Sequence, residues 1–503
     1  MKKMFITVFV CSAFTLAVSC VSAYEALRGP SELIYYDKSK AYNGYTLMGS
    51  GYLIDMEGRL VNAWPTLGRL LETGHVLART GQSEYDWDGN VVWRYNQNRS
   101  NYHPHHDAVR IFNRKLKEYT TIFIANKDLT HDDVIAAGAD PTWPRRGYAG
   151  SQMDALVEVD MKGNVVWEWW FFDHLVQDKF PDKANYAGRG KKISDYPAKL
   201  DINWGKTVER DWMHCNALDH NPALDHIAIS SVHGEFFVID HGGTFIPGDP
   251  EGSIKLAASD GGDFLYRWGD PAKYGYGEKP RIERDWIFIS TGTREMGANH
   301  DIQWIKPGCP GAGNFLIFNN NDQVYQSSSQ SELIEINPYL DANKQNSANY
   351  VWPHEAGWHT IRPDFKTTHQ FPRKRSNQIA WTYTANYTGG FFANHGSGCE
   401  RLPNGNTLGC AQSDGHLIEV TPEGECVWEY INPVTNSGIK KVITLEDFDK
   451  HGSFRARRFG PDFPAFKGRD MTPKVTLTEL TAKGLLKPPQ RRRGGKDTKG
   501  GKK

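Results

Sequence analysis

The chain has 503 residues, and its 59 Lys and Arg balance 59 Asp and Glu, so the formal net charge is zero. A composition of 39% hydrophobic and 12% aromatic residues excludes wholesale disorder, and the balanced charge argues against a general nucleic-acid binder. After the first 25 residues, no apolar run reaches the roughly 20 residues of a membrane-spanning helix. We therefore expect a globular, aromatic-rich protein without a transmembrane segment.

The first residues have the pattern of an export signal. Two lysines precede an apolar stretch from Phe5 to Val18, and Val21-Ser22-Ala23 has the small side chains of a cleavage site. We predict a signal peptide over residues 1–23 and a periplasmic or secreted mature chain from Tyr24. Lipid anchoring at Cys20 is the less favoured alternative, because the residues before it match a lipoprotein box poorly.

The other end of the chain is basic and of low complexity. Residues 481–503 are predicted to form a disordered tail, and within it residues 491–503 carry three Arg and four Lys against Asp497. Attachment to a surface or a polyanion is the alternative role. Without its two basic ends, the chain is mildly acidic.

Five cysteines remain outside the predicted signal, and no CxxC pair indicates a zinc site. Cys399 and Cys410 flank a predicted hairpin turn at Asn404-Gly405. A two-residue turn would place the cysteines opposite each other and permit a disulfide. A type I turn with Gly405 in the left-handed region would shift the register by one residue and separate them.

The body of the chain repeats two hairpin-like units. In one unit, an apolar strand, a polar turn with Gly and a second strand lead to a Trp. Its copies end at Trp64, Trp93, Trp167, Trp268, Trp352 and Trp428. The other unit begins with His and continues into a short strand. Its copies start at His106, His214, His300 and His395.

Two hairpins per repeat make a four-stranded antiparallel sheet, and several such sheets set radially form a β-propeller, which leaves few exposed edges. The hairpin that ends at Trp64 lacks an inner half, and we predict that strands after Val434 complete it. The expected fold is all-β: a six-bladed β-propeller over residues 24–480, its ring closed by N- and C-terminal strands. Long loop insertions are expected at residues 173–210 and 353–377.

The innermost strands of a propeller face its central channel, so the four repeat-initial histidines are predicted to share one position and ring one mouth. Imidazole suits both proton transfer and nucleophilic attack near neutral pH. Two other roles stay open: histidines that lock each blade through backbone hydrogen bonds, or a metal site formed by the ring. No phosphate-binding or dinucleotide motif is present, so no nucleotide cofactor is predicted.

Several of these segments together resemble the bacterial arylsulfate sulfotransferases. The resemblance runs from about Tyr45 to about Arg469 and includes Tyr52 to Gly58, His300 to Trp304 and Arg401 to Leu408. It implies a periplasmic six-bladed propeller that moves a sulfuryl group from an aryl sulfate to a phenol without any cofactor. It also implies a ping-pong cycle through a sulfohistidine.

The resemblance assigns roles to particular residues. His300 matches the family's nucleophile, and His106 and His214 match its supporting catalytic histidines. Asn216 matches a substrate-binding Asn two residues past the second of these. His395 or Ser397 lies near a family Thr at the last inner strand, and we assign the binding role to His395.

One position departs from the family. An Arg that contacts the sulfate typically follows the Ile-Ser-Ser strand, where this chain has Val232. Arg294, shortly before His300, is the substitute we consider for binding the substrate, with an exposed loop cation as the alternative. Two rival functions follow: a non-catalytic ligand-binding propeller, and a metal-dependent enzyme that uses the histidine ring. The donor, the acceptor and the oligomeric state stay open.

Overall fold

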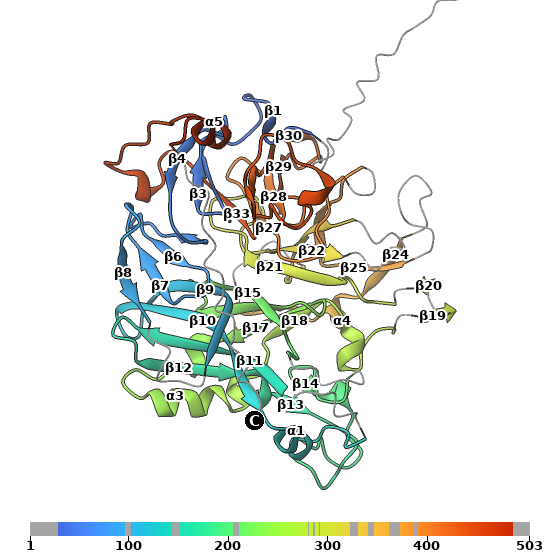
Figure 1. Ribbon diagram of the computed structural model, residues 1–503. Helices are drawn as coiled ribbons and strands as arrows, with labels where there is room; N and C mark the ends of the chain where they lie inside the picture. The colour runs from blue at the N-terminus through green and yellow to red at the C-terminus, as the bar shows by residue number, and fades with distance from the viewer. Residues whose placement is uncertain are drawn as a thin grey trace, which may run out of the picture.

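Six antiparallel sheets follow one another along the chain and surround a common channel (Figure 1). The computed structural model describes residues 29–95, 102–142, 151–204, 211–279, 281–284, 287–290, 292–321, 330–340, 347–361, 373–386 and 390–485. The predicted six-bladed propeller is confirmed. The predicted signal peptide and most of the predicted basic tail lie outside the described residues.

Blades 2 to 5 each take four strands in chain order, and the first strands of neighbouring blades contact one another around the channel. Blade 2 contains β5 (Gly68–Leu70), β6 (Val76–Ala78), β7 (Ser83–Tyr85) and β8 (Val91–Arg94). Blade 3 contains β9 (His103–Asn113), β10 (Glu118–Leu129), β11 (Ser151–Asp160) and β12 (Val165–Trp170). Blade 4 contains β15 (Cys215–Asn221), β16 (His226–Ser231), β17 (Glu235–Asp240) and β18 (Tyr266–Trp268). Blade 5 contains β21 (Ala298–Trp304), β22 (Phe315–Asn321), β23 (Glu332–Ile336) and β26 (Ile379–Tyr383).

The two ends of the described chain meet at blades 1 and 6. Blade 1 contains β33 (Ala456–Phe459), β2 (Tyr45–Met48), β3 (Tyr52–Ile54) and β4 (Leu60–Ala63). Blade 6 contains β27 (Gly398–Arg401), β28 (Thr407–Ala411), β29 (His416–Val420), β30 (Cys426–Ile431) and an added outer strand, β1 (Glu32–Tyr36). Since β33 pairs antiparallel with β2, a strand after Val434 completes the N-terminal hairpin, as predicted.

The repeated Trp links each blade to the next. Its indole Nε1–H donates to the turn between the third and fourth strands of the following blade, which explains why a Trp and a Gly turn recur together. The carbonyl acceptors are Asp86 for Trp64, Met161 for Trp93, Pro422 for Trp381 and Met56 for Trp428, each at 2.8–2.9 Å. In blade 3, Trp167 donates to Oγ1 of Thr244 at 3.1 Å.

The prediction for blade 5 was wrong in one respect. Trp352 lies just before the short helix α4 (Pro353–Ala356), and Trp381 on β26 occupies the blade position instead. The reason is the length of the insertion between β23 and β26, which carries α4 and the hairpin of β24 (Trp358–Ile361) and β25 (Arg373–Ser376).

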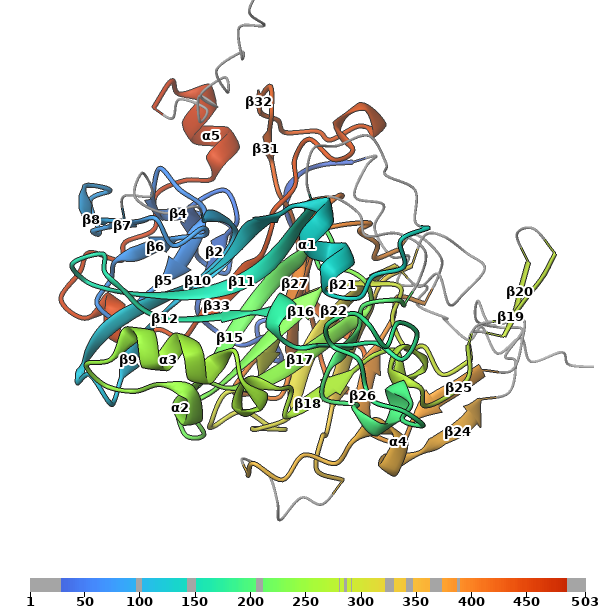
Figure 2. The same ribbon diagram turned by 90° about the horizontal axis from the view of Figure 1, so that it is seen from below.

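The remaining elements are short and lie around the blades. Three two-stranded pairs join β13 (Leu175–Val176) to β14 (Leu200–Asp201), β19 (Arg281–Arg284) to β20 (Ile287–Ser290), and β31 (Val434–Thr435) to β32 (Gly438–Ile439). The other helices are α1 (His131–Ala136), α2 (His241–Thr244), α3 (Pro250–Ala257) and α5 (Leu477–Ala482). Helix α3 lies along β12 (Figure 2). Among the described residues, no helix is long and apolar enough to cross a membrane.

The turn between β27 and β28 determines whether Cys399 and Cys410 lie opposite each other. Gly405 has φ of +94° and its N–H donates to Leu402 O at 2.9 Å, so it takes the left-handed position of the longer turn. Cys399 therefore pairs with Gly409, and Cys410 with Gly398. The register is shifted by one residue, and both thiols are free and buried.

Candidate active site

The four His-led units supply the first strands of blades 3 to 6, and all enter the channel from the same mouth. One non-glycine residue in the left-handed region lies just before or within the first four residues of each strand: His106 (φ 51°), His214 (φ 43°), Asp301 (φ 62°) and Ser397 (φ 83°). This conformation is unfavourable for side chains with a Cβ, and its recurrence marks a strained site.

The left-handed residue also corrects the predicted equivalence of the histidines. His106 and His214 occupy it, but His300 precedes it by one residue and His395 by two. The structural counterpart of His300 in blade 3 is therefore His105. Both rings bond to an Asn of the second strand, Asn320 and Asn126 respectively.

His106 and His214 lie in contact, with ring centroids 4.9 Å apart. Nδ1 of His106 lies 2.7 Å from Nδ1 of His105, whose Nε2 lies 2.7 Å from the carboxylate of Asp154. Because the carboxylate can only accept, we assign the proton of His105 to Nε2 and that of His106 to Nδ1. The lone pair of His106 is then on Nε2. Burial, with the nearby His105, lowers the pKa of His106 to about 2.

His214 has a different environment. Its Nδ1 lies 2.7 Å from Oδ2 of Asp211, and this hydrogen bond raises the pKa of His214 above its usual value despite partial burial. The backbone N–H of Val232 donates to the carbonyl of His214 at 3.2 Å. Val232 thus supports the backbone here but brings no charge.

His300 is only 3% exposed. Its Nδ1 lies 2.6 Å from Oδ1 of Asn320, whose amide donates to the carbonyls of Ala393 and Gly396. These bonds orient the Asn320 oxygen toward His300, so we place the proton on Nδ1 and the lone pair on Nε2. The Gly396 N–H donates to Nε2 at 3.2 Å. Burial lowers the pKa of His300 to about 3, so its ring is neutral at pH 7.

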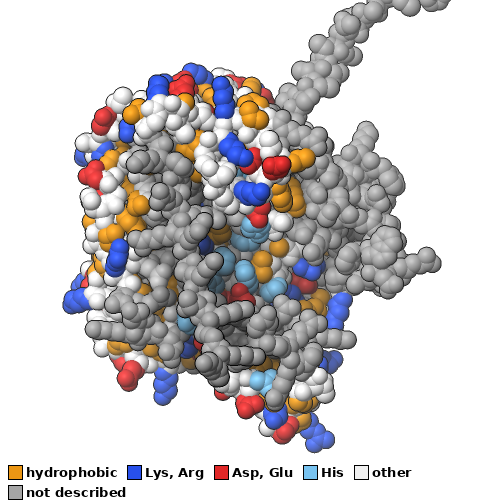
Figure 3. Space-filling view, in the orientation of Figure 1, with side chains coloured by type: hydrophobic (Ala, Val, Ile, Leu, Met, Phe, Trp, Pro, Cys, Tyr) orange, Lys and Arg blue, Asp and Glu red, His pale blue; other side chains and the backbone are white. Residues whose placement is uncertain are grey.

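Phe454, just before β33, connects the histidines with two arginines. Its ring centroid lies 6.4 Å from those of His106 and His300. The guanidinium carbons of Arg79 and Arg455 lie 4.6 Å and 5.0 Å from the same centroid. On the face drawn in Figure 3, histidine side chains gather in the hollowed middle of the molecule.

A buried ion network lies beneath these rings. Asp107 accepts from Arg69 at 2.8 Å and from Arg455 at 2.7 Å, while Asp301 accepts from Arg457 at 2.6 Å. Arg455 also lies 2.9 Å from Asp301 and so joins the two carboxylates. Three Arg stand against two Asp in these ion pairs. Although burial opposes it, the neighbouring Arg455 and Arg69 hold the pKa of Asp107 below its usual range.

Arg79 adds a further cation at the mouth. Its Nη1 donates to the carbonyl of His106 at 2.9 Å. Among the described residues, no carboxylate forms an ion pair with Arg79. Its charge is therefore available to an anion near His106, and no repeat or motif of the sequence marks this arginine.

The other predicted binding residues lie around this centre. Asn216 is buried, donates to Asn299 O at 2.7 Å and accepts from Ser230 Oγ at 2.8 Å. Arg294 donates to the carbonyls of Met296 and Gly297 in its own loop, both at 2.7 Å.

The His395 side chain is 43% exposed and lies 3.0 Å from Asp449. Its neighbour Gly396, not its ring, bonds to His300. The structure thus places His106, His214 and His300 at one mouth and His395 at its edge.

The described mouth histidines do not bring three metal-ligand atoms within 4.8 Å of one another; within the described chain, His220, Asp225 and His241 do so. A void of about 30 Å³ is lined by residues that include Arg79, Phe454 and Arg455. A cavity of about 680 Å³ lies at the opposite ends of the inner strands, near Leu70, Lys306 and Phe459. No described histidine lines either cavity, so the candidate site is defined by the histidine rings themselves, beside Phe454.

Comparison with known proteins identifies one family. A family model described as arylsulfotransferase (ASST) matches residues 71–351, more than half of the chain. No curated protein gives a significant match.

Two solved structures align at 10% identity. One is a protein of unknown function from Bacteroides caccae, over 83% of this chain and 96% of that one, with a TM-score of 0.28. The other is the β-propeller domain of Cps50 (Swd1) from Myceliophteria thermophila, over 80% and 90%, with a TM-score of 0.29. Such low TM-scores carry no argument about function.

Proposed function

The chain belongs to the arylsulfotransferase (ASST) family, and from this premise we propose that it moves a sulfuryl group from an aryl sulfate to a phenol through a sulfohistidine at His300. Family membership gives the coarse activity, an aryl sulfotransferase. The observation that carries the finer proposal is the environment of His300, a neutral imidazole whose Nδ1 is held by Asn320.

A nucleophilic imidazole must be neutral and must present an unprotonated nitrogen. Both conditions hold for His300, because burial lowers its pKa to about 3 and Asn320 keeps the proton on Nδ1. Nε2 accepts from the Gly396 N–H at 3.2 Å, a long hydrogen bond. An incoming sulfuryl group displaces this contact, and the freed N–H can then donate to a sulfuryl oxygen.

His214 is our choice for the proton carrier. Asp211 holds its Nδ1 and raises its pKa, which favours the protonated ring that can donate from Nε2. His106, whose low pKa keeps it neutral, presents an acceptor beside His214 and can orient a substrate hydroxyl.

The two half-reactions balance with these groups. In the first, Nε2 of His300 bonds to sulfur, the bond from sulfur to the aryl oxygen breaks, and His214 protonates the leaving phenolate. In the second, the acceptor phenol gives its proton to His214, its oxygen bonds to sulfur, and the bond from nitrogen to sulfur breaks. The enzyme returns to its starting protonation state.

The sulfuryl oxygens require positive donors as charge shifts during transfer. We propose that Arg79 supplies the charge that Val232 lacks. It lies over Phe454, whose ring is near both His106 and His300, donates to the His106 carbonyl, and has no carboxylate partner among the described residues. Asn216 and Arg294 remain proposed substrate-binding residues. We give them a smaller role than Arg79, because each side chain already donates to a backbone carbonyl.

The proposal is tested by turnover of a nitrophenyl sulfate with phenol as acceptor. We expect His300→Asn to abolish transfer, and the control His359→Asn, an exposed histidine on β24, to retain it. Retained transfer in His300→Asn would overturn the nucleophile. Binding of aryl sulfates by the wild-type chain without any turnover would favour a non-catalytic propeller.

A further inference from the structure

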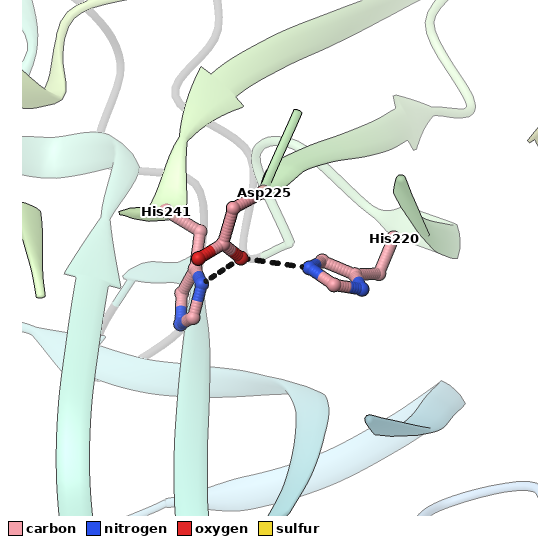
Figure 4. A group of neighbouring side chains, drawn as sticks. All are labelled: His220, Asp225 and His241. Carbon is pink, nitrogen blue, oxygen red and sulfur yellow. Dashed lines mark hydrogen bonds and ion pairs between the residues drawn. The ribbon is translucent and has the colours of Figure 1, made fainter. Parts of the chain in front are cut away.

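Three ligand-type side chains converge at the far end of blade 4 (Figure 4). His220 stands near the end of β15, Asp225 lies in the turn to β16, and His241 opens α2. Nε2 of His220 and Nδ1 of His241 each lie 2.8 Å from Oδ1 of Asp225. All three ligand atoms lie within 4.8 Å of one another.

This cluster is separate from the candidate active site. His214 stands at the channel-mouth end of β15 and His220 near its other end. Six residues of extended chain span roughly 20 Å. The two groups of histidines therefore lie at opposite ends of blade 4.

The local backbone is built to aim Asp225 at the two rings. Asp225 has φ of +57°, an unfavourable conformation held by its N–H donating to Asn221 O at 2.8 Å. The Gly242 N–H donates to Asp225 O at 2.9 Å. A Cβ on Gly242 would lie 2.9 Å from Oδ2 of Asp225, so glycine leaves room for the carboxylate.

A second carboxylate fixes the orientation of His241. Nε2 of His241 lies 2.9 Å from Oε2 of Glu158 on β11 of the neighbouring blade. Glu158 is buried, and its other oxygen accepts from Asn113 at 2.9 Å and Thr120 at 2.5 Å. Metal-binding histidines commonly donate their second N–H to such a carboxylate, which leaves the other nitrogen for the metal. Here that nitrogen is Nδ1, the one that faces Asp225.

We propose that His220, Asp225 and His241 bind a divalent transition metal, with zinc as the preferred ion. Two imidazoles and one carboxylate are a ligand set of zinc sites that keep a fourth position open. With bonds of about 2.0–2.1 Å, tetrahedral ligand atoms lie about 3.3 Å apart, so the two pairs now at 2.8 Å need to open by only about half an ångström. The Asp225 side chain is 25% exposed, which gives water access to the fourth position.

Metal binding would join the β15–β16 turn to α2 within blade 4. The hydrogen bond between His241 and Glu158 would link both to blade 3. The protons now shared between Asp225 and the two rings would leave as the metal enters. A ligand that binds only the folded chain raises its melting temperature with concentration. We therefore expect zinc to stabilise the protein whether or not it affects catalysis.

The test starts from chelator-treated full-length protein titrated with zinc chloride in a calorimeter, and with Co²⁺ followed by visible absorption. We expect one equivalent of zinc to bind, a rise in melting temperature, and the absorption bands of tetrahedral Co²⁺. His220→Gln and Asp225→Asn should each weaken binding by more than about tenfold. His241 is not substituted, because its loss would leave the buried carboxylate of Glu158 without its imidazole partner.

Two controls identify the site. His214→Gln removes a mouth histidine and His359→Gln an exposed one, and both should bind zinc like the wild type. Far-UV circular dichroism establishes that each variant is folded. If either His220→Gln or Asp225→Asn does not fold, the other one carries the test. The proposal is overturned if the wild type binds no zinc at micromolar concentrations, or if both ligand variants bind it as tightly as the wild type.

Discussion

His214 and His300 are both imidazoles of one channel mouth, yet their surroundings shift their pKa values in opposite directions. Asp211 raises the pKa of His214, whereas burial lowers that of His300 to about 3. Pairs of titratable groups whose environments separate their pKa values are typical of acid–base and nucleophile assignments. The division of labour between proton donor and nucleophile therefore follows from two local contacts, to Asp211 and to Asn320.

The role of Asp211 leads to a first prediction. Asp211→Asn removes the charge that favours the protonated form of His214, so proton donation to the leaving group should weaken. We expect kcat/KM to fall on the order of a hundredfold with an aryl sulfate of high leaving-group pKa, and far less with a nitrophenyl sulfate. Steady-state kinetics with both donors measure the difference. Equal losses for the two donors would contradict the acid role of His214.

A second prediction concerns the cation at the mouth. Arg79→Gln should lower kcat/KM for aryl sulfates by about a hundredfold, because one positive donor to the sulfuryl oxygens is lost. The control Arg94→Gln removes an exposed arginine at the end of β8 and should have no effect. Adding Val232→Arg to Arg79→Gln places a cation where the family typically has one and should restore part of the activity. Unchanged kinetics in Arg79→Gln would remove this residue from the site.

At the scale of secondary-structure elements, a hydrogen bond from a Trp links each of five blades to the next, and we call this contact the Trp latch. A Trp at the end of one blade donates to the third turn of the next, and this contact repeats in five blades. In blade 4, Trp268 is buried and its Nε1 has no partner among the described residues. The following blade carries its long insertion where the acceptor turn would be. Length alone does not decide the contact, because Trp167 of blade 3 reaches Thr244 in the long connection between β17 and β18 of blade 4.

The third prediction tests the latch where the ring closes. Trp428 is 0% exposed and donates to Met56 O, so it joins blade 6 to blade 1. Trp428→Phe leaves a buried carbonyl unsatisfied and should lower the free energy of unfolding by about 1–3 kcal/mol. Trp93→Phe removes the same bond at a partly exposed position and should cost less. Urea unfolding of both variants measures how much free energy of unfolding each one loses. Equal losses would contradict the argument that burial of the hydrogen bond sets its cost.

The repeat was the part of the fold that sequence could predict, because each blade is built from local hairpins with a period-two pattern and a Gly turn. Two errors came from irregularities that break the period. The blade 5 insertion separates β23 from Trp381, so Trp352 looked like the end of the unit. The bulged start of the inner strands moved His300 one residue from the position of His106, and so concealed His105 as its counterpart.

At the scale of the whole molecule, the channel is held by contacts that the sequence does not reveal. Arg455 bonds to Asp107, 348 residues earlier, and Arg457 to Asp301, 156 residues earlier. The one available sign was that an Asp follows both His106 and His300. Arg455 lies just before β33 of blade 1 and Arg457 lies within it, and only ring closure brings these arginines to the two Asp residues. Candidate histidines could thus be predicted one by one, but the charge around them could not.

The fourth prediction concerns stability against pH. The unfolded chain has histidine pKa values near 6.5, and folded His300 has one of about 3. Between these values the unfolded state binds more protons, so stability rises with pH and is lost as pH falls below about 6.5. A single such group contributes a slope of about 1.4 kcal/mol per pH unit. Urea unfolding between pH 7.5 and 5 should show a shallower slope for His300→Asn than for the wild type. Parallel slopes would show that His300 titrates normally.

The central claim is that sulfur passes through His300. The most direct measurement is rapid quenching of the protein with a sulfur-labelled aryl sulfate in the absence of acceptor, followed by peptide mapping. We predict that the wild type carries one labelled sulfuryl group on the peptide containing His300, that added phenol removes it, and that His300→Asn acquires none. Label in His300→Asn equal to the wild type, or label mapped to another peptide, would contradict the account.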